Sequence, residues 1–213
     1  MTEGSGRLEA FSDGVMAIAI TLLVLDLAVP AREQLDGQSL AHALGKLWPN
    51  FAAFVVSFMV IGIIWVNHHA IFVRVRQVDR VVLFANLLLL LVVSTIPFPT
   101  RLLAEYLTAG DADAHVAAAG YSGTMLAMSV AYVLLWLAVT RSQDLLEPSL
   151  DVQVARRSVT RFGAGVGFYA ATVALAFVSA PLTLLVHFAL ALYYCFDQLG
   201  SGSAAGTSAV EQV

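Results

Sequence analysis

The chain has 213 residues, of which 59% are hydrophobic and 12% charged, and its mean hydropathy is +0.82. This composition excludes a soluble globular domain and indicates an integral membrane protein. The formal net charge of -4 excludes a nucleic-acid partner, which would require a basic surface.

Six apolar segments are long enough to cross a bilayer, which takes about 20 residues per helix. They are predicted over 9–30, 49–73, 81–106, 114–140, 161–179 and 182–199. The predicted fold is therefore all-α, an integral membrane bundle of six helices within residues 1–199. Residues 200–213 are rich in Gly, Ser and Ala and are predicted to form a disordered cytoplasmic tail.

The connections between the spans carry their own signals. The first span is long for a signal peptide and carries Asp13, so we expect it to be retained. Residues 31–46 should form an outer connection that is partly helical or lies at the membrane interface. Pro97 and Pro99 should kink or break the third span near its outer end. The last two spans meet at "VSAPLT", where Pro181 suits the first turn of a helix, and so predict a tight hairpin.

Basic residues predict the orientation, because Lys and Arg near span ends are held in the cytoplasm. With the N-terminus inside, most of the arginines lie on the inner side and few basic residues on the outer side. The inner set is Arg7, Arg74, Arg76, Arg80, Arg141, Arg156, Arg157 and Arg161, and the outer set is Arg32, Lys46 and Arg101. We expect a multi-pass protein of the inner (plasma) membrane with both termini in the cytoplasm.

The first span, in "RLEAFSDGVMAIAITLLVLDL", combines an apolar face with a polar start. At about 100° per residue, Ile18, Leu22 and Leu25 fall within about 60° of one another, with Thr21 at their edge. Such a seam is typical of ordinary packing or lipid contact, and it is also what a channel gated by dewetting requires. The polar signature occurs once in the chain, so a pore would need several subunits.

The polar residues at the start of this span have two interpretations. Ser12 and Asp13 could cap a helix, but "GRLEAF" is itself compatible with a helix and would place them inside the span, where an ionisable group needs a partner. We expect a buried network of Arg7, Asp13 and one of two histidines. The other polar residues predicted at this depth are Ser12, Trp65, Asn67, His68, His69 and Asn86.

Catalysis and cofactor binding are not indicated. His68 and His69 are adjacent, whereas helical metal ligands are normally spaced i and i+4, so we expect no metal site. The chain has no GxSxG, HExxH or Walker sequence, and we expect neither an enzyme nor a cofactor. Asp26, at the outer end of the first span, is either solvated or, in a symmetric oligomer, part of an acidic ring at a pore mouth.

The pattern Arg7-x-x-x-Phe11-Ser12-Asp13-Gly14, with "IGIIWVNHHAIF" and "NLLLLLVVSTIPFPTRLLAE" in the next two spans, resembles the bacterial branch of the transmembrane protein 175 family of potassium channels. The resemblance covers the first half of the chain. It implies a homotetramer of six-helix subunits whose first helices line the pore. Ile18 would be the constriction, Thr21, Leu22 and Leu25 further pore layers, and Arg7, Phe11, Ser12 and Asp13 a motif that holds the pore helix in register.

The resulting prediction is a potassium-permeable cation channel, weakly selective for potassium over sodium, whose partners are further copies of itself, monovalent cations and the bilayer. Two alternatives stay open. Asp13 and the histidines could serve a proton-linked secondary transporter, although such proteins usually show internal repeats and broken helices. A membrane scaffold without transport activity would instead have a dry axis or no symmetric oligomer.

Overall fold

The computed structural model describes residues 5–27, 29–31, 37–110, 112–148, 152–153 and 159–207, and the side chains of all of these except 160–162 and 196–207. In this part of the chain the regular elements are helices, which confirms the all-α prediction. In chain order they are α1 (Gly6–Leu22), η1 (Leu23–Asp26), α2 (Leu40–Lys46), α3 (Trp48–Phe72), α4 (Arg80–Thr95), α5 (Pro97–Tyr106), α6 (Ala112–Val139), η3 (Gln143–Leu145), α8 (Val159–Ala176) and α9 (Ala180–Thr207).

Four helical segments of the described chain are long and apolar enough to cross a membrane. They are Gly6–Asp26, Trp48–Phe72, Arg80–Tyr106 and Ala112–Val139. The fifth and sixth predicted spans correspond to two shorter apolar helices, Gly163–Ala176 and Ala180–Cys195. The predicted outer connection contains α2, as expected.

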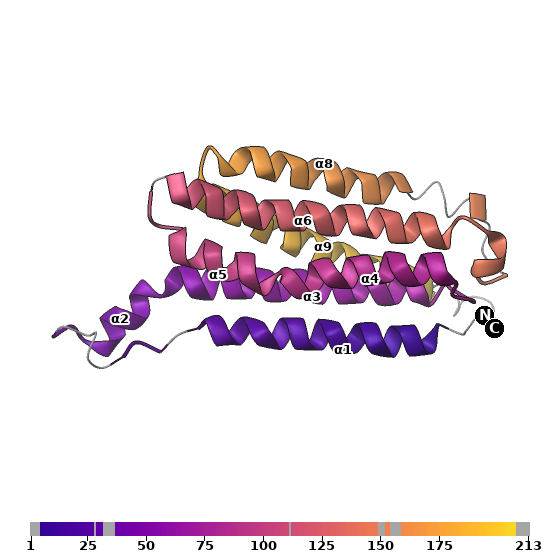
Figure 1. The fold of residues 1–213 in the computed structure, drawn as a ribbon, viewed down its shortest axis with the longest axis horizontal. Helices are drawn as coiled ribbons and strands as arrows, with labels where there is room; N and C mark the ends of the chain where they lie inside the picture. The colour runs from indigo at the N-terminus through magenta and orange to yellow at the C-terminus, as the bar shows by residue number, and fades with distance from the viewer. Residues whose placement is uncertain are drawn as a thin grey trace.

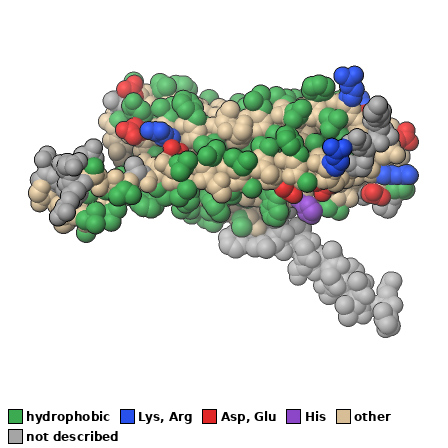
Figure 2. Space-filling view, turned by 60° about the horizontal axis from the view of Figure 1, so that its bottom comes forward, with side chains coloured by type: hydrophobic (Ala, Val, Ile, Leu, Met, Phe, Trp, Pro, Cys, Tyr) green, Lys and Arg blue, Asp and Glu red, His purple; other side chains and the backbone are tan. Residues whose placement is uncertain are grey.

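The helices run side by side along the long axis of the molecule, with α1 along one edge and α8 along the opposite edge (Figure 1). The main contacts of α1 are with α3 and α4, whereas α6 packs against α4, α5, α8 and α9. Hydrophobic side chains cover the length between the two ends, and charged side chains lie mostly toward the ends (Figure 2). This is the surface expected of a protein whose middle faces lipid.

The third span is broken where the prolines predicted it. Helix α4 ends at Thr95 and α5 begins at Pro97, with Ile96 between them. Proline has no N–H to continue the helical ladder. Thr95 instead donates its hydroxyl to the carbonyl of Val92 at 2.7 Å, so the side chain supplies a donor just before the break.

The loop between α3 and α4 is held by the segment that follows α6. Val75 and Leu146 form an isolated antiparallel bridge, in which Arg76 N donates to Leu145 O at 2.9 Å. Asp79 accepts from Val81 N and Val82 N at 3.0 and 3.1 Å, and so caps α4. The same carboxylate forms an ion pair with Arg141 at the end of α6. This corner ties the second, third and fourth spans together.

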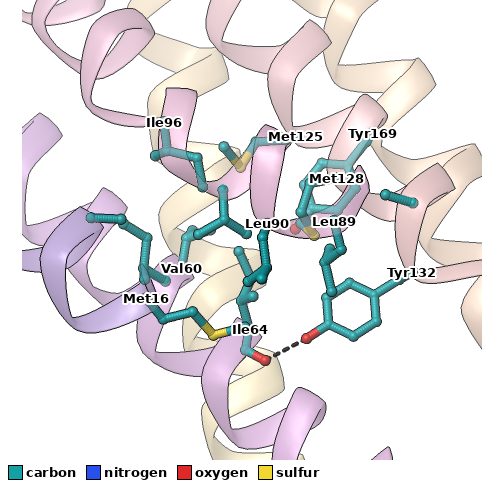
Figure 3. Close-up of a cluster of buried hydrophobic side chains, with 14 of the residues drawn as sticks. Met16, Val60, Ile64, Leu89, Leu90, Ile96, Met125, Met128, Tyr132 and Tyr169 are labelled. Atoms are coloured by element: carbon teal, nitrogen blue, oxygen red, sulfur yellow. Dashed lines mark hydrogen bonds between the residues drawn. The ribbon is translucent and has the colours of Figure 1, made fainter. Parts of the chain in front are cut away.

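The core runs along the seam between α1, α3, α4 and α6 (Figure 3). Met16 of α1 reaches toward Val60 and Ile64 of α3, and Tyr132 of α6 donates its hydroxyl to the carbonyl of Ile64. Burial of such side chains in a close-packed interior holds the bundle together.

The fold places the predicted inner and outer charges at opposite ends. Arg7, Arg74, Arg76, Arg80 and Arg141 stand where α1 and α4 begin and α3 and α6 end, and Lys46 and Arg101 lie toward the other end. Arg32, Arg156 and Arg157 lie outside the described residues, as does the side chain of Arg161. Which end faces the cytoplasm stays a prediction.

The last two helices form the predicted hairpin, since α8 ends at Ala176, α9 begins at Ala180, and Pro181 lies in its first turn. The backbone of α9 continues as helix to Thr207, and residues 208–213 lie outside the described part. The disordered tail over 200–213 stays a prediction.

Candidate functional site

Helix α1 has one buried face and one exposed face. Ser12, Met16, Ala19 and Leu23 are buried, at spacings of four, three and four residues. This is the period of a helix that packs along one side, and that side faces α3 and α4. The face opposite is free of contacts that would bury it.

The predicted apolar seam lies on the exposed face. The side chains of Ile18, Leu22 and Leu25 are 61%, 43% and 74% exposed, and Phe11 lies on the same side and is also exposed. Thr21 is exposed too, and its hydroxyl donates to the carbonyl of Ile18 at 2.9 Å. We call the side chains of Phe11, Ile18, Leu22 and Leu25 the outward stripe.

Asp26 ends η1 at the outer end of this segment and is half-buried. Arg101 of α5 lies close enough to act on its charge, in agreement with the packing of α5 against η1. The predicted pore-mouth acid therefore has a basic neighbour that the sequence analysis had not paired with it.

Three of the predicted polar residues form a buried hydrogen-bonded chain across α1, α4 and α3. Ser12 Oγ donates to Leu8 O at 2.8 Å, so its oxygen is free to accept, and Asn86 Nδ2 donates to it at 3.0 Å. His68 Nε2 lies 2.8 Å from Asn86 Oδ1. Because an amide oxygen only accepts, His68 carries a proton on Nε2. We call Ser12, Asn86 and His68 the inner polar layer.

All three members of the inner polar layer are at most 1% exposed. Leaving one buried polar group without its partner costs about 1–3 kcal/mol, so each member depends on the others. The layer fixes the rotation of α1 about its own axis, because only one face of the helix carries the serine. The outward stripe is thereby held away from α3 and α4.

A second set of contacts between α1 and α3 lies nearer the surface. Trp65 Nε1 donates to Asp13 Oδ1 at 2.9 Å, and His69 Nδ1 lies 4.0 Å from Glu9 Oε2. The rings of Trp65 and His69 are stacked, with centroids 6.5 Å apart. The predicted buried network of Arg7, Asp13 and one histidine is therefore wrong, because Arg7 and Asp13 are both exposed and Asp13 bonds to an indole. Of the two histidines, His68 lies inside and bonds to Asn86, and His69 lies at the surface near Glu9.

The remaining predicted residues are more peripheral. Arg7 is exposed in the first turn of α1, and Asn67 of α3 is half-buried. Glu9, which the sequence analysis did not single out, faces His69. Among the residues whose side chains are described, no group of three or more His, Cys, Asp and Glu side chains could hold a metal ion.

A further set of buried polar residues, which the sequence analysis missed, lies among α3, α5, α6 and α9. Ser57 Oγ is 2.7 Å from Thr100 Oγ1 and 3.0 Å from Tyr121 Oη, and Ser122 Oγ is 3.0 Å from His187 Nε2. We call these five residues the outer polar layer. Their signal in the sequence is a lone polar residue inside an apolar run, such as Ser57 in "FVVSFMV".

Comparisons with known proteins agree with this architecture. The family described as endosomal/lysosomal potassium channel TMEM175 matches residues 7–97. A Streptomyces collinus protein named as a potassium channel is 56% identical over 195 residues, which are 92% of this chain and 93% of that protein. A Gallus gallus protein named as an endosomal/lysosomal proton channel is 38% identical over 106 residues, 47% of this chain and 21% of that protein.

A solved structure shows the same fold. The crystal structure of a Chamaesiphon minutus homologue, described as a lysosomal potassium-selective channel homologue, superposes with a TM-score of 0.80 at 41% identity, over 91% of this chain and 97% of that one. The identity over nearly the whole length, together with this likeness, establishes the relationship. The chain belongs to the TMEM175 family.

Proposed function

We propose that the chain is one subunit of a potassium-permeable cation channel, in which four copies surround an ion pathway lined by α1. The observation that carries the proposal is the division of α1 into a face fixed by the inner polar layer and a face, the outward stripe, that stays uncovered. The names of the relatives, potassium channel in bacteria and proton channel in animals, support a function in cation permeation.

In this proposal Ile18 forms the constriction. Four isoleucine side chains meeting at an axis make an apolar throat, which conducts when wetted and closes when dry. Leu22 and Leu25 continue the apolar lining, Thr21 adds a hydroxyl beside the constriction, and Asp26 borders the outer mouth with Arg101 of α5 in its neighbourhood. An apolar lining does not replace the hydration shell of an ion, so we expect only weak preference for potassium over sodium.

The remaining parts of the chain serve this pathway as scaffold. We propose six spans within residues 1–199, with α8 and α9 as the fifth and sixth. We further propose a plasma-membrane location, with both termini and the Gly/Ser/Ala-rich 200–213 tail in the cytoplasm. Permeation of this kind needs no cofactor. The positive end of the molecule, which carries Arg74, Arg76 and Arg80, supports the orientation.

Potassium flux tests the proposal directly. The purified protein reconstituted in liposomes should release potassium down a gradient, faster than empty vesicles do. Ile18→Asn should raise the flux about tenfold, the change produced by lowering a barrier by about 1.4 kcal/mol, because an amide wets the throat. Val116 of α6 is a matched control, since it is also 61% exposed, and Val116→Asn should leave the flux unchanged.

Two results would contradict the proposal. Wild-type protein that gives no flux above empty vesicles in repeated preparations is not a channel. Conduction that is the same in Ile18→Asn and wild type removes Ile18 as the constriction and leaves channel function standing.

Proton permeation is a second candidate, favoured by the animal relatives named as proton channels. A pH-sensitive dye inside the same vesicles separates the cases. Proton entry that follows the imposed gradient without saturation indicates a proton-permeable channel. Saturable potassium uptake that depends on a proton gradient would instead establish the alternative of a proton-linked transporter.

A further inference from the structure

A glycine occupies the middle of the outward-facing side of α1. At about 100° per residue, Gly14 lies between Ile18 and Thr21 around the helix, one turn nearer the N-terminus than Ile18. It is exposed, and a Cβ added to it would meet no atom within 4 Å. It lies within the regular helix and is not among the glycines with positive φ, which in the described chain are Gly37 and Gly110.

Nothing in the part of the subunit that the structure describes therefore requires glycine at position 14. Glycine is, after proline, the residue least favourable to a helix interior, because it loses the most backbone entropy on folding. The neighbouring positions on the same side carry large side chains, Phe11 before it and Ile18 after it, both exposed. Gly14 is thus a gap in the side chains that line this side of α1.

We propose that Gly14 opens a wide, water-filled chamber immediately on the N-terminal side of the Ile18 constriction, in which the permeant cation keeps its hydration shell. The inference rests on the proposed channel function. Around a shared axis, the level of Gly14 would be the one where four helices present backbone in place of side chains. Exposed backbone is polar, and a polar, roomy site holds water where an apolar one of the same size stays dry.

A small residue on a membrane helix has another known use, because it lets two helices approach closely. The side chains on either side of Gly14 argue against that use here. Phe11 and Ile18 lie one turn away in each direction on the same side, and their bulk sets the distance between facing helices. The backbones at Gly14 are held apart by these neighbours, and the space between them is left for solvent.

The test is to fill the chamber by steps. In liposomes, Gly14→Ala should reduce potassium flux a few-fold, and Gly14→Leu at least tenfold, because four leucines add a second apolar constriction. Gly120 of α6 is a matched control, since it too is exposed and a Cβ there meets nothing within 4 Å. Gly120→Leu should conduct like the wild type.

A cysteine at position 14 gives a second measurement, which does not depend on the volume of the substituted side chain. In a Cys195→Ala background, Gly14→Cys should react with a charged, membrane-impermeant thiol reagent applied from the side of the α1 N-terminus, and the flux should then fall. The background protein, which has no other cysteine, should be unaffected. The oligomeric state of each variant is measured in detergent.

The outcomes separate the two levels of inference. Wild-type protein without flux contradicts the channel itself. A conducting wild type with an unchanged flux in Gly14→Leu, or with a Gly14→Cys thiol that does not react, overturns the chamber alone. A Gly14→Leu variant that loses its tetramer also overturns it, since this result assigns Gly14 to contact between copies.

Discussion

The two polar layers share α3 but otherwise join different helices. The inner polar layer joins α1 to α3 and α4 through directional hydrogen bonds between buried groups. The outer polar layer joins α3, α5, α6 and α9 and includes no residue of α1. At the outer level α1 is held by apolar contacts of Ala19 and Leu23. Hydrogen bonds are directional, whereas apolar contacts are not, so we expect the rotation of α1 to be fixed mainly at its inner end.

The largest loss of stability is expected from removing Asn86, the central residue of the inner polar layer. Asn86→Ala leaves the buried His68 Nε2 without its partner, at a cost of about 1–3 kcal/mol. It also removes the donor to Ser12, whose hydroxyl still bonds to Leu8 O. The thermal midpoint in detergent should fall, and flux should change as well, because the rotation of α1 is no longer fixed.

A double-mutant cycle sharpens the contrast between the layers. Ser12→Ala and Asn86→Ala should be strongly coupled, since the two side chains bond directly. Ser57→Ala and Asn86→Ala should add, since Ser57 bonds to Thr100 and Tyr121 whereas Asn86 bonds to Ser12 and His68. Coupling of similar size in both cycles would mean that the two layers act as one network.

Breaking the outer polar layer should lower stability by a smaller amount and leave the flux unchanged. Ser57→Ala removes the partner of Tyr121 and one of the contacts of Thr100, whose hydroxyl still donates to Ile96 O at 2.8 Å. We expect a loss of about 1–2 kcal/mol in stability, seen as a lower thermal midpoint. Flux per amount of reconstituted protein should stay at the wild-type level. A Ser57→Ala protein that conducts differently would show that the outer polar layer also positions the pathway.

The smallest loss of stability is expected from breaking the surface hydrogen bond between Trp65 and Asp13. Trp65→Phe keeps an aromatic ring beside His69 and loses only the exposed bond to Asp13. The stability change should be below about 1 kcal/mol, because water replaces the lost donor. A loss of stability as large as that of Asn86→Ala would show that the bond between Asp13 and Trp65 also holds α1 in position.

The parts of this site that were predictable are those with a local cause. The two prolines after Ile96 lack amide donors, and the side of α1 that carries Ile18 and Leu22 follows from helical period alone. The depth of Asn86 and the histidines followed from counting along antiparallel spans.

The parts that could not be predicted depend on packing between distant segments. Helix α3 is apolar on all sides, so its sequence does not say which of two adjacent histidines points inward. The contact of Ser57 with Tyr121 joins residues 64 positions apart, and the bridge of Val75 with Leu146 joins two connecting segments. No local sequence pattern predicts either of these two contacts.

The winding of η1 decides which side chain the outer end of α1 presents. In a 3-10 helix about 120° separates successive residues, so Leu25 stands directly over Leu22 and Asp26 over the buried Leu23. Asp26 is thereby turned from the outward stripe to the side of η1 that packs against α3 and α5. Wound as α-helix, at about 100° per residue, the same segment would bring Asp26 about 80° closer to the outward stripe and would leave Leu25 within it. The 3-10 winding of η1 therefore keeps a carboxylate off the apolar face of α1.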